Sequence, residues 1–177
     1  MRLLGGLIEI ERRREFVPGA SAMSALDDYG RYFDEPRAFG AYLESSVAVY
    51  ACAKLRAQTV SGLPLRIYKG VGEDRTEVES GPARNLFDRV NPFWTFNRLM
   101  SMTELTLSLW GECYWFVERG KGNVPQELWW ARPDRVRVIP HKTDYIAGYA
   151  LVEKDTGRLI PFAPEEVVRF AYPNPND

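Results

Sequence analysis

The chain contains 177 residues, of which 45% are hydrophobic and 27% charged, so it is long enough to bury a hydrophobic core and differs from a disordered segment. Its 23 lysines and arginines and 24 aspartates and glutamates give a net charge of −1, which argues against a strongly basic nucleic-acid binder. Two well-separated cysteines and a single histidine favour neither a disulfide framework nor a metal site, and no apolar run approaches the ~18 residues of a membrane span. We therefore expect a reduced, soluble, non-secreted protein without a membrane segment.

The first 41 residues differ in composition from the rest of the chain. They combine a run of arginines with scattered prolines, glycines and aspartates, which are typical of weakly ordered segments. Because the arginine run is flanked by Glu11 and Glu15, a solvated arm is favoured over a nucleic-acid anchor. We predict a weakly ordered N-terminal arm over 1–41 and an α+β region over 42–177.

A first helix is predicted after the serine pair 45–46, which can cap it, and it ends at Gly62. Its apolar side chains recur at helical spacing and predict one apolar face made of Val47, Tyr50, Ala51 and Leu55. An apolar–polar alternation over 63–68 predicts a strand, which belongs at a sheet edge because Pro64 has no N–H to donate. A glycine-containing stretch over 69–81 then predicts a hairpin with a solvated return strand.

Two more helices are predicted before the chain changes to strands. A proline suits the first position of a short helix over 82–90, and Asn91-Pro92 ends it because proline disfavours a helical conformation in the residue before it. Thr95 then caps a helix over 96–110. The apolar stripe of this helix is wider than about 100°, so we expect it to be buried on more than one side.

After Gly111 the apolar residues alternate, which predicts a strand that contains Cys113. The stretch 120–123 predicts a hairpin turn. Further strands are predicted at 128–131, 135–139, 149–152 and 167–170. This order predicts the α+β class, with two main helices packed on a mostly antiparallel β-sheet or small barrel.

No group of residues predicts catalysis, metal binding or cofactor binding. His141 follows a proline near a strand end, where a surface turn residue is favoured over a general base. Cys113 lies in an apolar strand pattern, which favours a buried, inert thiol over a nucleophile, and Cys52 is interpreted in the same way. Glu165 and Glu166 are typical of the acidic first turn of a short helix.

Two other features have both a structural and a ligand-binding interpretation. The stretch 120–122 joins two strands and lacks the spacing of a phosphate-binding loop, so a turn is favoured. Trp129 and Trp130 are expected on opposite faces of a strand, one inward and one outward. The outward ring can stack on a base or become buried in a subunit contact, and core or interface packing is favoured.

Several short motifs follow one another in a characteristic order: VAVYAC at 47–52, SGLPLRIY at 61–68, PARNLF at 82–87 with Asn91-Pro92, LSLWGECYW at 107–115, and PQEL at 125–128 with ARPDRV at 131–136. In this order and spacing they resemble the N-terminal half of the tailed-phage portal protein family, over about residues 45–172. Glu112 stands where the family usually has asparagine; both are polar residues at a strand start, so we infer no change of function. The stem, clip and channel loop of the family lie in a later part that this sequence lacks.

The resemblance implies a peripheral, wing-like region and structural roles for certain motif positions, which are Leu63, Pro64, Asn91, Pro92, Gly111 and Pro133. Exposed aromatic residues are expected to anchor contacts with neighbouring subunits or the capsid shell. The candidates are Trp94, Trp129 and Trp130.

The resemblance also implies a structural function without enzymatic activity or cofactors. Portal proteins form a ring of about twelve subunits at one capsid vertex, through which double-stranded DNA is packaged and ejected. The implied partners are further copies of the chain, DNA bound without sequence specificity, the terminase large subunit, the major capsid or scaffold protein, and a head-tail adaptor, with no membrane. The implied location is the portal vertex of the virion, and the host cytoplasm during assembly.

Two functions of other classes remain open at this point. The first is a small single-stranded nucleic-acid-binding module in which Trp129 or Trp130 stacks on bases. The second is an enzyme that uses Cys113 or His141, which is the least favoured of the three.

Overall fold

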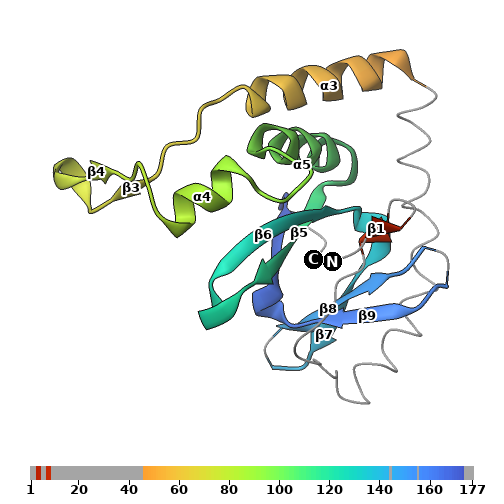
Figure 1. Ribbon diagram of the computed structural model, residues 1–177. Helices are drawn as coiled ribbons and strands as arrows, with labels where there is room; N and C mark the ends of the chain where they lie inside the picture. The colour runs from red at the N-terminus through yellow and green to blue at the C-terminus, as the bar shows by residue number, and fades with distance from the viewer. Residues whose placement is uncertain (1–2, 5–6, 9–45, 144, 155, 174–177) are drawn as a thin grey trace. The chain divides into compact units, whose positions relative to one another are not determined.

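The computed structural model describes residues 3–4, 7–8, 46–143, 145–154 and 156–173 (Figure 1). The arm predicted over 1–41 lies outside these residues, apart from two short strands that pair antiparallel with each other, β1 (Leu3–Leu4) and β2 (Leu7–Ile8). The described chain from residue 46 onward divides into two compact units. We call them the helical unit, with residues 46–133 and 166–173, and the three-stranded unit, with Asp134–Glu165.

The helical unit combines helices, a hairpin and a sheet. Its helices are α3 (Val47–Ser61), α4 (Pro82–Asp88) and α5 (Phe96–Trp110). Its hairpin consists of β3 (Tyr68–Lys69), the 3-10 turn η1 (Gly72–Asp74) and β4 (Thr76–Glu77). Its antiparallel sheet has the order β10–β5–β6, with bounds Val167–Ala171, Glu112–Arg119 and Pro125–Ala131. The 3-10 turn η2 (Lys121–Asn123) connects β5 to β6.

The three-stranded unit is an antiparallel sheet of β7 (Val136–His141), β8 (Tyr145–Val152) and β9 (Leu159–Phe162), in that order. The 3-10 turns η3 (Pro133–Arg135) and η4 (Pro164–Glu166) lie at its two ends. Ile139 and Ala150 are its most buried apolar residues. The guanidinium group of Arg135 donates two hydrogen bonds to the carbonyl oxygen of Val152, at 3.1 and 3.0 Å, and so ties the start of β7 to the end of β8.

The predicted α+β class is confirmed, and the sheet arrangement is now defined. The described strands from residue 46 onward form two open three-stranded sheets and a two-stranded hairpin, and none of these sheets closes into a barrel. All pairs in the three-stranded sheets are antiparallel. The prediction of a mostly antiparallel sheet therefore holds, and the alternative of a small barrel does not hold for these residues.

The helix ends follow from capping residues in the sequence. The hydroxyl oxygens of Ser46 and Thr95 each accept a hydrogen bond from the backbone N–H three residues later, as N-caps of α3 and α5. At the other end of α5, Gly111 has a φ of 77°, a left-handed conformation that glycine adopts without steric cost. This residue turns the chain directly from α5 into β5, as the change of period at that point predicted.

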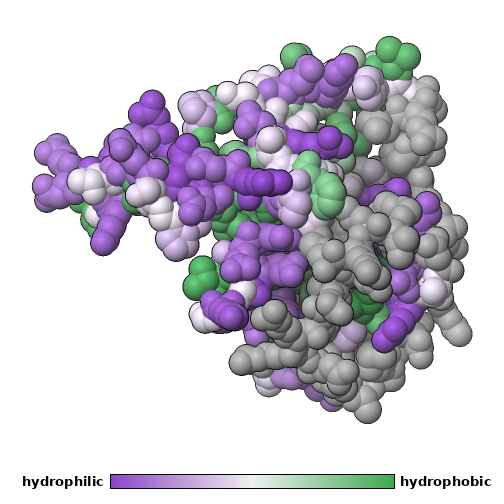
Figure 2. Space-filling view, viewed as in Figure 1, coloured by the Kyte–Doolittle hydropathy of each residue, from purple (hydrophilic) through white to green (hydrophobic). Residues whose placement is uncertain are grey.

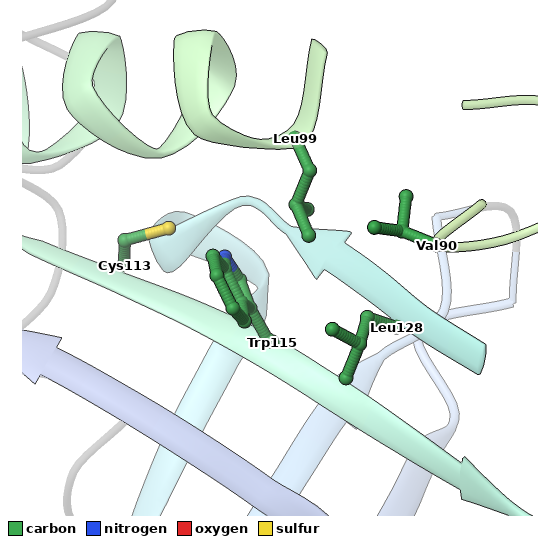
Figure 3. Close-up of a cluster of buried hydrophobic side chains, with 5 residues drawn as sticks. All are labelled: Val90, Leu99, Cys113, Trp115 and Leu128. Carbon is green, nitrogen blue, oxygen red and sulfur yellow. The ribbon is translucent and has the colours of Figure 1, made fainter. Parts of the chain in front are cut away.

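The core of the helical unit lies between α5 and the β5–β6 face of the sheet (Figure 3). Leu99 from α5 faces Cys113 and Trp115 from β5, and Val90 and Leu128 complete the buried cluster. The expectation that the 96–110 helix is buried on more than one side is confirmed, because α5 packs against α3 as well as against β5 and β6.

Two local predictions are wrong. The predicted apolar face of α3 is exposed, with Val47 and Leu55 at 85% and 66%, because the helix packs on α5 through the opposite, small residues Ala53 and Ala57. Residues 64–67 form no strand, because Pro64 has no N–H to donate; the backbone pairing consists of one hydrogen bond from Val78 to the carbonyl oxygen of Ile67, at 2.8 Å, and the strand that starts at Tyr68.

Candidate assembly surface

Asn91 is a buried polar residue among the motif positions that the sequence singled out, at 2% exposure. Its side-chain oxygen accepts hydrogen bonds from the backbone N–H groups of Phe93 and Trp94, at 3.0 and 2.9 Å, and its amide donates to the carbonyl oxygen of Leu128 at 2.9 Å. The N–H of Leu128 in turn donates to Val90, at 2.7 Å. This one side chain therefore fixes the turn between α4 and α5 onto β6, while Pro92 beside it is exposed.

Gly111 and Glu112 join three parts of the helical unit. The carbonyl oxygen of Gly111 accepts a hydrogen bond from the N–H of Tyr172, at 2.8 Å, just after β10. The carboxylate of Glu112 accepts from the hydroxyl of Tyr114 at 2.7 Å and from Arg169 on β10 at 3.1 Å. Glu112 thus holds the two strands together across the sheet, which gives this departure from the family motif a structural role.

Aromatic residues stack between α5 and the sheet. The rings of Trp94 and Trp130 are stacked at 6.1 Å between centroids, and the guanidinium of Arg98 lies over Trp94 at 5.0 Å. The indole N–H of Trp130 donates to Thr106 at 3.1 Å, and that of Trp115 donates to Thr103 at 2.8 Å. The two threonine hydroxyls on α5 thereby satisfy two indole groups in the core.

The tryptophans predicted as exposed anchors are largely covered. Trp129 is 5% exposed and donates its indole N–H to Glu127, at 3.0 Å. Trp130 is half-buried on the opposite face of β6, and Trp94 is also half-buried. The expectation that one ring of the 129–130 pair points outward is wrong, because both faces of β6 are covered at these positions. Phe93 is the exposed aromatic of this region, at 58%.

The candidate catalytic groups Cys113 and His141 differ in their exposure. Cys113 is fully buried, and burial raises the pKa of its thiol to about 11, so it carries no thiolate near neutral pH. His141 is exposed at the end of β7, with a nitrogen 3.1 Å from the hydroxyl of Thr143. Among the described residues no cluster of His, Cys, Asp and Glu could hold a metal ion. Cys52, predicted to be buried, is exposed, because α3 packs only through its alanine side.

The remaining motif positions divide between core and surface. Pro133 is buried at the start of η3, whereas Leu63 and Pro64 are exposed after α3. The glycine-containing stretch 120–122 forms the β5–β6 turn, as predicted.

None of the described helices has the length and apolar character needed to cross a membrane.

Sequence reasoning missed the residues that hold α3 in place. Arg56 lies 2.8 Å from the carboxylate of Glu104, which is almost buried on α5, and it also donates to the hydroxyl of Tyr172 at 3.0 Å. The carboxylate of Glu104 raises the pKa of Arg56 above its ordinary value. The small residues Ala53 and Ala57, spaced i and i+4, are a signal that could have identified the contacting side of α3.

Two exposed surfaces of the helical unit remain without packing in the described residues. The first, the α3 stripe, consists of Val47, Ala51 and Leu55, at spacing i, i+4 and i+8. The second, the hairpin arm, comprises residues 63–79 and extends beyond α4 and away from α5 (Figure 1). Figure 2 shows hydrophobic side chains over α3 and a mainly hydrophilic surface on the arm. Exposed surfaces of this kind are candidates for contacts with a partner.

Comparison with known proteins identifies one protein family. The model of the family described as "Phage portal protein" matches residues 47–177. The search of curated proteins found no match.

Solved structures share the fold. A chain from the neck of an empty gene transfer agent (GTA) particle, computed with C6 symmetry, is 22% identical with a TM-score of 0.68, and the match covers 78% of this chain and 38% of that one. The neck of the native particle, computed with C12 symmetry, gives 22% identity and a TM-score of 0.64, covering 80% and 37%. An HK97-family phage portal protein from Corynebacterium diphtheriae is 17% identical with a TM-score of 0.52, covering 74% and 39%. The chain therefore spans less than two fifths of the length of each of these chains.

Proposed function

This chain belongs to the phage portal protein family, and we propose that it forms the wing-like part of a portal ring of about twelve subunits at one vertex of a capsid. Phage portal proteins are structural components of virions, so the function of the chain lies in its surfaces. The match of the family model over residues 47–177 is the observation that carries the proposal. The fold shared with chains from symmetric particle necks supports it.

In this proposal the ring surrounds the path of double-stranded DNA during packaging and ejection. The net charge of −1 supports such a role, because each phosphate that a protein neutralises adds to its affinity for DNA and would slow sliding. The proposed partners are further copies of the chain, the major capsid or scaffold protein, the terminase large subunit and a head-tail adaptor. Assembly takes place in the host cytoplasm, and the mature location is the portal vertex.

The test is the copy number of the chain in particles. A tagged chain is produced in cells that assemble the particles, which are purified on a density gradient and analysed by quantitative mass spectrometry against the major capsid protein. We expect about twelve copies per particle, as a single ring at one vertex requires. A tagged unrelated protein of similar size serves as the control for trapping. Particles that lack the chain, or that contain it in numbers similar to the capsid protein, would contradict the proposal.

A further inference from the structure

We propose that the hairpin arm of one subunit docks on the α3 stripe of a neighbouring copy of the chain. The inference rests on the proposed function, since it names the surfaces that join subunits of the ring. In a ring the contact is heterologous, so each subunit needs two different surfaces, one for each neighbour. The α3 stripe and the hairpin arm are two such surfaces within one helical unit.

The α3 stripe has the chemistry of a receptor surface. Val47, Ala51 and Leu55 line one side of three helical turns, opposite the alanines that pack on α5. Tyr50 flanks the stripe, and the ammonium group of Lys54 lies 5.6 Å from the centre of its ring. α3 contains no acidic residue, and because Arg56 is paired with Glu104, Lys54 supplies the positive charge beside the stripe.

The hairpin arm has matching apolar and acidic groups. Val71 at its tip is 91% exposed, and Leu63 and Tyr68 nearer its base are exposed as well. The tip also contains the acidic residues Glu73 and Asp74, in η1. An exposed valine beside two carboxylates matches Leu55 beside Lys54, in both apolar character and charge.

Two of the three basic residues of the hairpin arm are engaged within the arm, and Lys69 is the third. Arg66 lies 3.4 Å from the carboxylate of Glu77 at the base of the hairpin, and Arg75 lies over the ring of Tyr68 at 5.1 Å. These two cations are therefore engaged along the hairpin itself. The arm is also held by few contacts to its own unit, among them a 3.5 Å hydrogen bond from Arg84 to the carbonyl oxygen of Leu65. A protruding segment of this kind gains most of its burial from a neighbour.

The first test is site-specific cross-linking of the full chain. Cys52 is an exposed thiol on α3, next to Ala51 of the stripe in sequence, and Cys113 is buried, so a Val71→Cys variant has two reactive thiols, one on the hairpin arm and one on α3. A short bis-maleimide should produce dimers, trimers and a ladder of higher species, because a heterologous contact repeats from copy to copy. The wild-type chain and a Cys52→Ser/Val71→Cys variant should give no species beyond a dimer. Val124→Cys, at an exposed valine in the β5–β6 connection, is the matched control and should give no ladder.

The second test is charge reversal, with mass measured by light scattering. Lys54→Glu should reduce the oligomer fraction at least several-fold, and Glu73→Lys/Asp74→Lys in the same chain should restore it. Lys121→Glu, at the β5–β6 turn, is the matched control and should leave the mass unchanged.

The outcomes of these experiments test the docking inference separately from the proposed function. An oligomeric wild-type chain whose Val71→Cys variant cross-links no more than Val124→Cys overturns the docking inference and leaves the ring intact. A wild-type chain that stays monomeric, together with a Val71→Cys variant that gives no ladder, also overturns the inference, because these surfaces then make no contact. The proposed function is decided separately, by the copy number in particles.

Discussion

At the scale of single residues, Asn91 makes the contacts that matter most for the turn between α4 and α5. Its side chain satisfies two backbone N–H groups and one carbonyl oxygen in a place that water does not reach. Buried polar groups that lose their partners cost more than the bond itself contributes, because their desolvation is no longer offset. The motif position Asn91 therefore has a physical reason that does not depend on any ligand.

Replacing Asn91 with alanine should destabilise the chain by about 2–4 kcal/mol, since three backbone groups lose their partner, in one buried and two partly buried hydrogen bonds. The measurement is urea unfolding followed by tryptophan fluorescence. Asn97→Ala is the matched control, because Asn97 is exposed and its amide makes one hydrogen bond, to the carbonyl oxygen of Ser61 at 2.9 Å. We expect the control to lose no more than about 1 kcal/mol. Equal losses of unfolding free energy in the two variants would show that the hydrogen bonds of Asn91 contribute no more to stability than the exposed hydrogen bond of Asn97.

At the scale of elements, the contact between α3 and α5 depends on small side chains. Ala53 and Ala57 are 4% and 3% exposed, whereas Val47 and Leu55 on the same helix are 85% and 66% exposed. Small residues let two helices approach closely, and a larger side chain at such a position forces them apart.

Ala57→Leu should destabilise the chain by about 1–3 kcal/mol, because the leucine overpacks the contact with α5. Ala48→Leu is the matched control, since Ala48 is exposed on the same helix and leucine has a similar helix propensity. Thermal unfolding monitored by circular dichroism would compare the two variants. If Ala57→Leu unfolds at the temperature of the control, the alanine contact is not the one that fixes α3.

The helices and most strands could be predicted from local patterns, whereas the burial of α3 could not. Capping at Ser46 and Thr95 and the glycine at Gly111 are local signals, and they placed the helix ends correctly. The face of α3 was predicted from hydrophobicity alone, which assumes that the most apolar side faces the core. Here the tighter approach through Ala53 and Ala57 determines the packing, and that choice depends on the shape of α5.

The candidate assembly surface was also predicted only in part, because burial depends on contacts between elements that the local pattern does not show. The motif order singled out Asn91 and Gly111, and both make backbone hydrogen bonds in the structure. Strand alternation placed Trp129 and Trp130 on opposite faces of β6. The prediction assumed that one of these faces is exposed to solvent, whereas both rings are at least half-buried. Residues that act across elements, such as Arg56 with Glu104, leave no signal at fixed sequence spacing.

At the scale of the whole molecule, charge predicts weak affinity for nucleic acid. With a net charge of −1, the chain should cause no gel shift of single- or double-stranded oligonucleotides at micromolar protein and about 0.15 M salt. Trp130→Ala should behave identically, because the ring of Trp130 packs on Trp94. Salt-dependent binding of single strands that is lost in Trp130→Ala would instead support the single-stranded nucleic-acid-binding module.

The order β10–β5–β6 has a consequence for how the chain is made. Phe116 at the centre of β5 pairs with Trp129 on one side and with Val167 on the other, and the whole three-stranded unit lies between these partners in the sequence. A ribosome that adds ~5–20 residues per second releases the β5–β6 hairpin seconds before β10 exists. During that interval one edge of β5 has no partner, and an unpaired edge is a template for pairing with other chains. Nascent chains of this protein therefore pass through a stage with an unpaired β5 edge. When several ribosomes translate one messenger RNA, these edges are close together, which favours misassembly of neighbouring chains over folding.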